Sequence, residues 1–282
     1  MMRIMRNVPL SRLTTIGLGG EAKRVFYPDS SLALIDAVRL CEEKDEKYFV
    51  LGAGSNVLPA DAGYDGTLIV TTDCARLCAE GETIRADCGA MTSAIAAFCR
   101  ARRLSGWEFF ASIPASVGGM VTMNAGACGL FMSDIVLRVH AYMDNKCVWL
   151  DRKDCRFGAK ESIFQTKGLV LAAEFSFFAS SREESAAALA RCGKMRSRQP
   201  KGRSMGCVFC NPPGISAGAL IQRCGLCGVR VGGAVISEEH GNFILNAGGA
   251  TERDVRTLIE LARERVLREC GVALQEEIIY LR

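Results

Sequence analysis

Two glycine-rich loops, each after a predicted strand, constrain the fold of this chain most strongly. The first is Gly52-Ala-Gly-Ser-Asn56, which follows the apolar run 48–51. The second contains Gly118-Gly119 and Asn124-Ala-Gly-Ala127. Small residues let backbone N–H groups approach an anion or a flat ring closely. A hairpin turn or tight helix packing would explain either loop singly, but the two together fit a large dinucleotide cofactor better than a small ligand.

Composition and motif spacing exclude several classes of protein. The first loop is not a GxGxxG fingerprint and no GK[ST] follows it, which disfavours nucleoside-triphosphate hydrolysis. The net charge of +4 requires no nucleic-acid partner and leaves room for an anionic ligand. No apolar run reaches the roughly 18–20 residues of a membrane span, and arginines interrupt the first residues. We therefore expect a cytoplasmic protein, with no membrane and no obligate protein partner implied.

The fourteen cysteines are predicted to be small core residues rather than disulfides or metal ligands. Two CxxC pairs, Cys207-x-x-Cys210 and Cys224-x-x-Cys227, could together form a four-thiolate zinc site. So many cysteines produce such pairs by chance, however, and two histidines are too few for a His-based centre. We expect no metal, and apolar neighbours predict buried positions for Cys41, Cys74, Cys78, Cys88, Cys99 and Cys147.

Periodicity predicts an α+β protein of at least two packed units. A basic, Gly- and Pro-containing stretch at 196–204 is the best boundary. Helices are predicted at 29–43 (with Asp29 or Ser30 as N-cap), 92–103, 182–195, 217–224 and 252–270. Strands are predicted at 48–51, 66–71, 83–88, 135–150, 169–178, 243–246 and 272–281.

The stretch Ser204-Met-Gly-Cys-Val-Phe-Cys-Asn211 carries the first candidate for chemistry. Cys207 follows a glycine where the backbone must turn sharply, so a small proton-bearing side chain there could face a cleft. Glu276 and Glu277 fall in the last predicted strand, where alternation sends one carboxylate to each face. One of them could reach the same cleft, although a pair of solvated charges is the plainer alternative.

A series of motifs in fixed order covers nearly the whole chain and resembles one family of flavoenzymes. The motifs are Thr15 to Gly20, Leu51 to Leu58, Gly106 to Glu108, Ile113-Pro114, Gly118-Gly119, Asn124 to Gly126, Gly206 to Pro212, Ser237-x-x-His240, Asn242-Phe243 and Leu274-x-x-Glu277. Together they resemble the UDP-N-acetylenolpyruvoylglucosamine reductases (the MurB family), in the shorter type that lacks an extra tyrosine loop.

This resemblance implies both a fold and a reaction. The fold would be a two-subdomain FAD-binding region of the vanillyl-alcohol-oxidase type plus a C-terminal α+β substrate-binding domain. The expected boundaries are 1–70, 71–180 and 181–271, with the last strand 272–282 returning to the first subdomain. NADPH would reduce a non-covalent FAD, which would reduce the enolpyruvyl group of UDP-N-acetylglucosamine enolpyruvate to give UDP-N-acetylmuramate for peptidoglycan.

The same resemblance assigns roles residue by residue. Cys207 stands where the family has a proton-donating serine, Glu277 matches the terminal glutamate, and Lys160 replaces an arginine. The expected FAD-binding residues are Gly52, Ala53, Gly54, Ser55, Asn56, Val57, Leu58, Ile113, Pro114, Ser116, Gly118, Gly119, Asn124, Ala125 and Gly126. Substrate binding is expected from Arg198, Asn211, His240 and Asn242.

Departures from the family pattern cluster around the substrate and keep two alternatives open. Ala159 replaces a tyrosine, Lys160 an arginine, and Cys210 a frequent lysine. A diverged flavoprotein of the same fold could act on another substrate, although no motif for covalent flavin attachment is present. A non-catalytic nucleotide-sugar binder is the other alternative.

Overall fold

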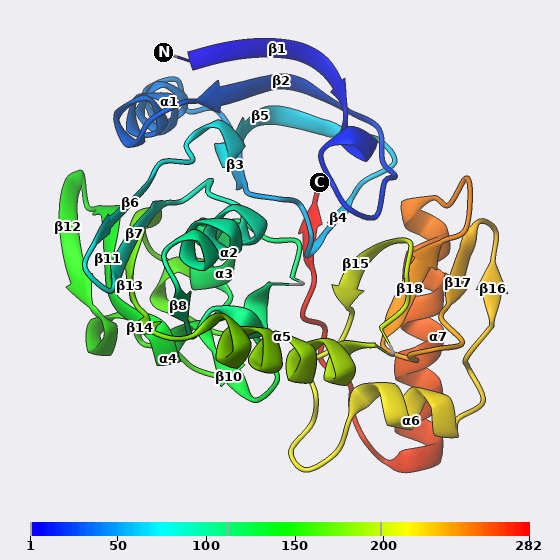
Figure 1. The fold of residues 1–282 in the computed structure, drawn as a ribbon. Coiled ribbons are helices and arrows are strands. Elements are labelled where there is room, and N and C mark those ends of the chain that lie inside the picture. The colour runs from blue at the N-terminus through cyan, green and yellow to red at the C-terminus, as the bar shows by residue number, and fades with distance from the viewer. Residues whose placement is uncertain (1, 112, 198) are drawn as a thin grey trace. The chain divides into compact units, whose positions relative to one another are not determined.

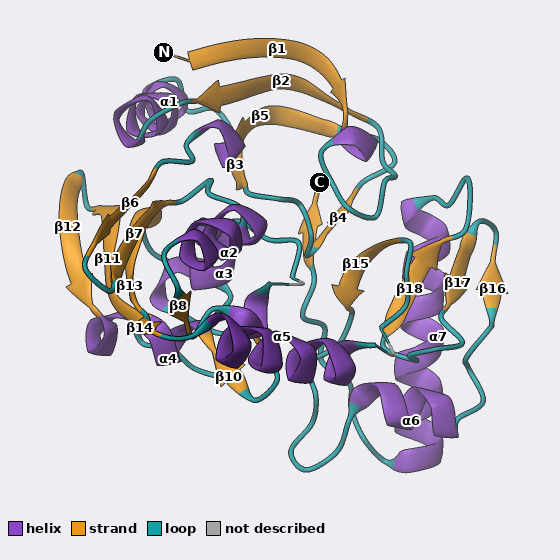
Figure 2. Cartoon of the chain, in the orientation of Figure 1, coloured by secondary structure: helices purple, strands orange, loops and turns teal. Residues whose placement is uncertain are grey.

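A computed structural model describes residues 2–111, 113–197 and 199–282. Helices and strands are mixed throughout (Figure 2), which confirms the predicted α+β class. Contacts divide the chain into two compact units. Unit 1 comprises residues 1–4, Phe26–Ala53 and Leu68–Ser197, and unit 2 comprises Met5–Val25, Gly54–Thr67 and Arg198–Arg282. The three-part domain division expected from the sequence stays a prediction.

A four-stranded sheet contains the strands that cross this division. Its order is β1-β2-β5-β3, and the division falls within β1, β2 and β5. The strands are β1 (Met2–Pro9), β2 (Glu21–Pro28), β3 (Tyr48–Leu51) and β5 (Tyr64–Val70). Between β2 and β3 the chain forms α1 (Ser31–Glu43), whose first turn is capped by Ser30 because its hydroxyl accepts the Ala33 N–H (3.3 Å).

Unit 1 is built on an antiparallel five-stranded sheet of order β12-β11-β13-β7-β6. Helix α3 packs on this sheet at β13 and β7 (Figure 1). The sheet strands are β6 (Leu77–Glu80), β7 (Thr83–Asp87), β11 (Val136–Met143), β12 (Lys146–Asp151) and β13 (Leu169–Ser176). The other elements are α2 (Thr92–Ala101), β8 (Leu104–Ser105), α3 (Val117–Thr122), β9 (Gly126–Ala127), β10 (Leu130–Phe131), α4 (Met132–Ile135), β14 (Phe178–Ala179) and α5 (Arg182–Arg196).

The predicted single strand at 135–150 is wrong, because the chain folds back within it. Asp144 and Asn145 have φ of 48° and 62° and join β11 to β12 in a two-residue turn. Such a turn needs left-handed backbone at both positions, which Asp and Asn tolerate better than most residues. The run therefore forms a hairpin.

Unit 2 holds a second antiparallel sheet, of order β15-β18-β17-β16. Helix α7 packs on β17 and β16 (Figure 1). The elements are β4 (Val57–Pro59), β15 (Arg203–Cys207), α6 (Ala217–Arg223), β16 (Arg230–Val231), β17 (Ala234–Ile236), β18 (Phe243–Asn246), α7 (Glu252–Cys270) and β19 (Ile279–Leu281). The last strand is shorter than predicted: β19 pairs with β4 in parallel, whereas Glu276 makes only an isolated bridge to Phe209.

Most cysteines that the sequence predicts to be buried lie in the core. Cys41, Cys74, Cys88 and Cys99 are at most 1% exposed, but the prediction is wrong for Cys78 and Cys147, which are exposed. Cys78 lies on β6 and Cys147 on β12, the two edge strands of the five-stranded sheet, where a strand has a neighbour on one side only. No helix within the described ranges has the length and apolar character to cross a membrane.

Helix α7 offers a test of local stability because both groups of its N-terminal capping box are engaged. The Thr251 hydroxyl accepts the Asp254 N–H (3.1 Å), and the Asp254 carboxylate accepts the Thr251 N–H (3.0 Å). We expect Thr251→Ala to lower the free energy of unfolding by about 1 kcal/mol. Thr257→Ala, in the exposed middle of the same helix, should change it by less than about 0.5 kcal/mol in the same denaturant titration. Equal effects of the two variants would contradict the capping role.

Candidate functional site

A β-bulge next to Gly206 sets the position of Cys207 in unit 2. Ser204 pairs with Leu245 and Cys207 pairs with Phe243, so β15 contains one residue more than β18 over this interval. Gly206 adopts φ +78°, a left-handed conformation that glycine takes without strain. Bulges of this kind redirect a side chain and are frequent beside active sites. The sharp turn predicted before Cys207 is confirmed, and the Cys207 side chain is partly exposed.

Asn242 holds the strand that continues from Cys207. Its side chain accepts the Phe209 N–H (2.9 Å) and donates to the Phe209 carbonyl (2.8 Å), while its own carbonyl accepts the Val208 N–H (2.9 Å). Asn242 is 2% exposed, so both ends of its amide are used inside the protein. The structure thus gives Asn242 a positioning role, and its direct contact with a substrate stays a prediction.

The C-terminal segment lies against the other edge of the same stretch. The Glu277 N–H donates to the Val208 carbonyl (2.8 Å), and the Cys210 N–H donates to the Gln275 carbonyl (2.9 Å). Glu277 is therefore held beside the residue that follows Cys207, although the two are far apart in sequence. The backbone of the predicted glutamate thus lies next to that of the predicted proton donor, and an interaction between their side chains stays a prediction.

The carboxylate of Glu276, the neighbour of Glu277 in the sequence, contacts two side chains. The Glu276 carboxylate accepts a hydrogen bond from the Tyr280 hydroxyl (2.5 Å) and pairs with Arg263 (3.0 Å). Burial, followed by this hydrogen bond, raises the pKa of Tyr280. Glu276 is thus held by an ion pair and a hydrogen bond, and the role of Glu277 as the functional carboxylate stays a prediction.

The loop after β3 is joined to these segments by two polar residues. The Asn56 side chain donates to the Glu277 carbonyl (3.0 Å). The Thr15 hydroxyl donates to the Ser204 carbonyl (2.6 Å), and the Thr15 N–H donates to the Gly54 carbonyl (3.1 Å). Thr15 is a positioning residue; its motif is visible in the sequence, but this role is not, because its partners lie 39 and 189 residues away along the chain.

In unit 1 Gly52, at the start of the first glycine-rich loop, meets the N-terminus of α3; Gly118 and Gly119 lie inside this short helix, so the loop predicted for them is wrong. A Cβ added to Gly52 would lie 2.2 Å from the Ser116 hydroxyl, which already caps α3 by accepting the Gly119 N–H (3.4 Å). Gly118 packs against a different residue: a Cβ added there would lie 3.1 Å from the Cys88 side chain. At Gly119 the nearest atom to an added Cβ is the Ser116 hydroxyl at 3.5 Å, and the residue is exposed. This open backbone fits the close approach that a flat ring requires.

Asn124 connects the second loop to the segment that carries Lys160. Its side chain donates to the Gly158 carbonyl (2.8 Å) and accepts the Ser133 N–H (2.9 Å). The Ser162 hydroxyl also donates to the Thr122 carbonyl (2.7 Å). Lys160 itself has φ +62°, an uncommon conformation for a residue with a side chain, and such strain is concentrated at functional sites.

The remaining predicted residues divide between the two units. His240 lies half-buried against α6, its Nδ1 accepts the Asn242 N–H (3.2 Å), and burial lowers its pKa. The side-chain oxygen of Asn211 accepts the Ala217 N–H (3.0 Å). Arg198 lies outside the described residues. Gly52, Ala53, Ile113, Pro114, Ser116, Gly118, Gly119, Asn124, Ala125, Gly126 and Lys160 belong to unit 1, and Gly54 to Leu58, Cys207, Asn211, His240, Asn242 and Glu277 to unit 2.

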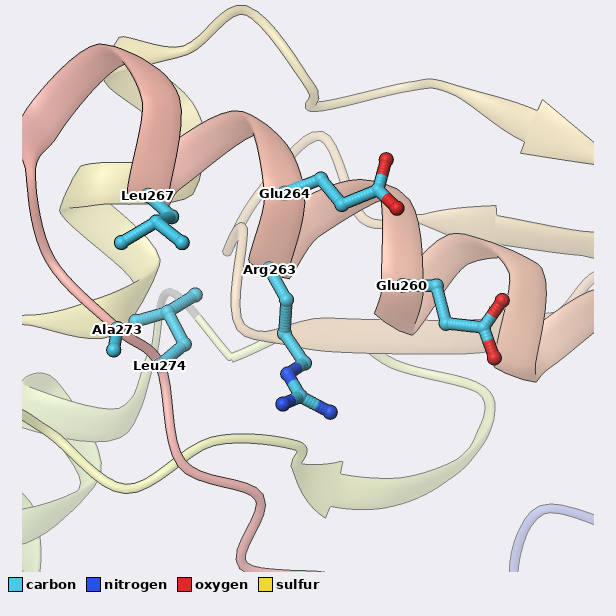
Figure 3. A pocket seen from close by; sticks show the side chains of 6 residues that line it. All are labelled: Glu260, Arg263, Glu264, Leu267, Ala273 and Leu274. Atoms are coloured by element: carbon cyan, nitrogen blue, oxygen red, sulfur yellow. The ribbon is translucent and has the colours of Figure 1, made fainter.

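A pocket of about 280 Å³ in unit 2 contains none of the predicted site residues. It is lined by Glu260, Arg263, Glu264, Leu267, Ala273 and Leu274 (Figure 3). Across the part of the chain that the structure describes, no three His, Cys, Asp or Glu side chains gather to hold a metal ion. The two CxxC pairs therefore do not assemble into a four-thiolate cluster there.

Comparison with known families first defines the class of protein. Residues 22–146 match an FAD-binding domain, and residues 198–281 match the C-terminal domain of UDP-N-acetylenolpyruvoylglucosamine reductase. The chain is thus an FAD-dependent oxidoreductase, which confirms the predicted cofactor.

Relatives along the whole chain then define the family. UDP-N-acetylenolpyruvoylglucosamine reductases from Caldicellulosiruptor bescii and Moorella thermoacetica are each 37% identical over 99% and 98% of this chain, covering 91% and 93% of their own lengths. The crystal structure of the reductase from Thermus caldophilus is 33% identical, with a TM-score of 0.87 over all of both chains. The chain belongs to the UDP-N-acetylenolpyruvoylglucosamine reductase family, as the motifs predicted.

The contact between Gly52 and Ser116 provides a test of the cofactor site. Gly52→Ala should displace the Ser116 hydroxyl from its capping position, and we expect at least a tenfold loss of FAD affinity by fluorescence titration. Gly193→Ala, on α5 with no atom within 4 Å of the new Cβ, is the matched control and should leave affinity unchanged. Because Ser116→Ala removes the clashing atom, the double variant Gly52→Ala/Ser116→Ala should lose less affinity than the two losses combined. Unchanged affinity in Gly52→Ala would show that the loop contact does not matter for FAD.

Proposed function

We propose that this protein uses NADPH and bound FAD to reduce the enolpyruvyl group of UDP-N-acetylglucosamine enolpyruvate, forming UDP-N-acetylmuramate for peptidoglycan. Family membership supports the reaction. The observation that carries the assignment to these residues is the bulged position of Cys207, next to the stretch hydrogen-bonded by Asn242 and Glu277. We also propose a cytoplasmic location, since a chain with fourteen thiols is compatible with a reducing compartment.

The protein itself would contribute one proton and two charged side chains to the reduction. The hydride for one carbon of the enolpyruvyl double bond would come from FAD that NADPH has reduced and that the segments at Gly52 and Gly118 would hold. In our proposal Cys207 gives its thiol proton to the other carbon and afterwards recovers a proton from solvent. Lys160 stabilises the negative charge that develops on the carboxylate-bearing carbon, but as a point charge without the bidentate fork of an arginine. Glu277 supports the proton donor.

The proposed FAD site follows the two glycine-rich loops. The diphosphate would lie on the backbone of Gly52 to Asn56, and the ring would lie near Gly118, Gly119 and Asn124. Gly119 is the best candidate for direct contact with the ring, because it is exposed and no atom crowds the position of a Cβ there. Ile113, Pro114, Ser116, Ala125, Gly126, Val57 and Leu58 complete the proposed cofactor surface, and the FAD is held without a covalent bond.

A half-reaction experiment tests the role of Cys207. We expect Cys207→Ala to leave the reduction of FAD by NADPH nearly intact and to slow reoxidation by the enolpyruvyl substrate by about 10²–10⁴-fold, the usual effect of a lost general acid. Stopped-flow absorbance of the flavin separates the two steps. Cys207→Ser should recover much of the rate because a hydroxyl can also donate a proton.

Cys210→Ala is the matched control, because it removes a thiol from the same stretch while keeping the backbone bond to Gln275. It should reoxidise at close to the original rate. Normal reoxidation in Cys207→Ala would refute the proton-donor assignment. Flavin reduction without any substrate-dependent reoxidation in the unaltered protein would instead indicate a different substrate or a nucleotide-sugar binder.

We propose that the basic stretch 196–201 helps to hold the substrate diphosphate, with Arg198 as the main contact and Asn211, His240 and Asn242 as further substrate-binding residues. Guanidinium groups recognise phosphate oxygens in a bidentate geometry. Arg198→Ala should raise KM for the enolpyruvyl substrate by tenfold or more and change kcat by less than about threefold. Arg182→Ala, at the exposed start of α5, is the control for a general loss of positive charge. An unchanged KM in Arg198→Ala would reject this assignment.

A further inference from the structure

Two cysteine thiols meet where α6 and α7 end. Cys224 is the C-terminal cap of α6 and Cys270 is the last residue of α7, and their sulfur atoms are 3.7 Å apart. Each cysteine is followed by a left-handed glycine, Gly225 with φ +68° and Gly271 with φ +70°. The two helices pack against each other (Figure 1). An S–S bond is about 2.05 Å long, so the two sulfurs would have to approach each other by less than about 2 Å to bond.

The two thiols differ in their access to solvent. Cys224 is 6% exposed, whereas Cys270 is partly exposed. Burial, followed by the hydrogen bond with Cys270, raises the pKa of Cys224 to about 11. Cys224 therefore stays protonated at neutral pH, and Cys270 is the sulfur that a dissolved oxidant meets first.

We propose that Cys224 and Cys270 form a reversible disulfide when the protein is exposed to a peroxide. The Cys270 sulfur attacks one peroxide oxygen, which gives a sulfenic acid and releases one water from hydrogen peroxide. The Cys224 thiol then gives up its proton as its sulfur attacks the sulfenic sulfur; the S–S bond forms, and the proton leaves with the sulfenic hydroxyl as a second water. Two thiols are oxidised by two electrons, one peroxide is reduced to two waters, and a small dithiol reverses the reaction.

This bond would fasten the start of the segment that carries Glu277. The chain leaves α7 at Gly271, immediately after Cys270, and then runs to Glu276 and Glu277. Joining this point to the end of α6 closes a loop between residues 224 and 270 and limits the unfolded chain. The inference rests on the geometry of unit 2 and does not depend on the proposed function.

Peptide mapping of the peroxide-treated holoprotein tests the pair directly. Trypsin releases Cys224 and Cys227 together in peptide 224–230 and Cys270 in peptide 269–282. The experiment therefore uses Cys227→Ser, in which a link between these peptides can only join Cys224 to Cys270. We expect a linked peptide lighter than the two thiol peptides by two hydrogens, formed with about one equivalent of hydrogen peroxide and removed by dithiothreitol.

The melting temperature gives a second readout. Oxidation should raise it by roughly 5 °C in Cys227→Ser. It should not raise it in Cys227→Ser/Cys270→Ser or in Cys227→Ser/Cys224→Ser. Linkage together with this pattern of shifts supports the proposal. Absence of the linked peptide, or conversion of Cys270 to sulfinic acid without linkage, overturns it.

Discussion

The buried amide of Asn242 is the interaction on which the unit 2 site depends. It replaces a neighbouring strand for Phe209 by accepting the N–H and donating to the carbonyl of the same residue. Because Asn242 is 2% exposed, no solvent could satisfy those two backbone groups if the side chain were lost. The opposite edge of the stretch is left for the C-terminal segment, and this is how Glu277 reaches the neighbourhood of Cys207.

Close packing also explains the glycines of the predicted cofactor site in unit 1. Gly52 is required by the Ser116 hydroxyl and Gly118 by Cys88, so these glycines serve the protein's own packing before they serve any ligand. At Gly119, by contrast, an added Cβ would make only an ordinary van der Waals contact, with the Ser116 hydroxyl at 3.5 Å. Motif matching alone treats these glycines alike, whereas their surroundings separate the residues that shape the site from the one suited to contact a ring.

Local patterns predicted the helices well and the strands less well. The limits of α1, α6 and α7 agree with the predicted helices to within a few residues, because their caps (Ser30, Ser216 and Thr251) and the terminal Gly271 are local signals. Most errors concern strands. The predicted strand 135–150 is the hairpin β11–β12, and only Ile279–Leu281 of the predicted strand 272–281 has a continuous partner. The strands β1 and β2 and the short helix α3 are not predicted at all. A strand needs neighbours distant in the sequence, and the pattern of one segment does not contain them.

By itself the sequence determined the family, the FAD cofactor and the turn before Cys207, since each depends on short motifs whose residues lie close together along the chain. Only the tertiary structure decided which side chains meet. It joins Asn56 to Glu277 by a hydrogen bond across 221 residues and places the Asn242 side chain beside the Phe209 backbone. It also brings Cys224 into contact with Cys270 rather than with its CxxC neighbour Cys227. The physical reason is that hydrogen bonds and thiol contacts act over about 3–4 Å, and only the folded backbone brings distant residues that close.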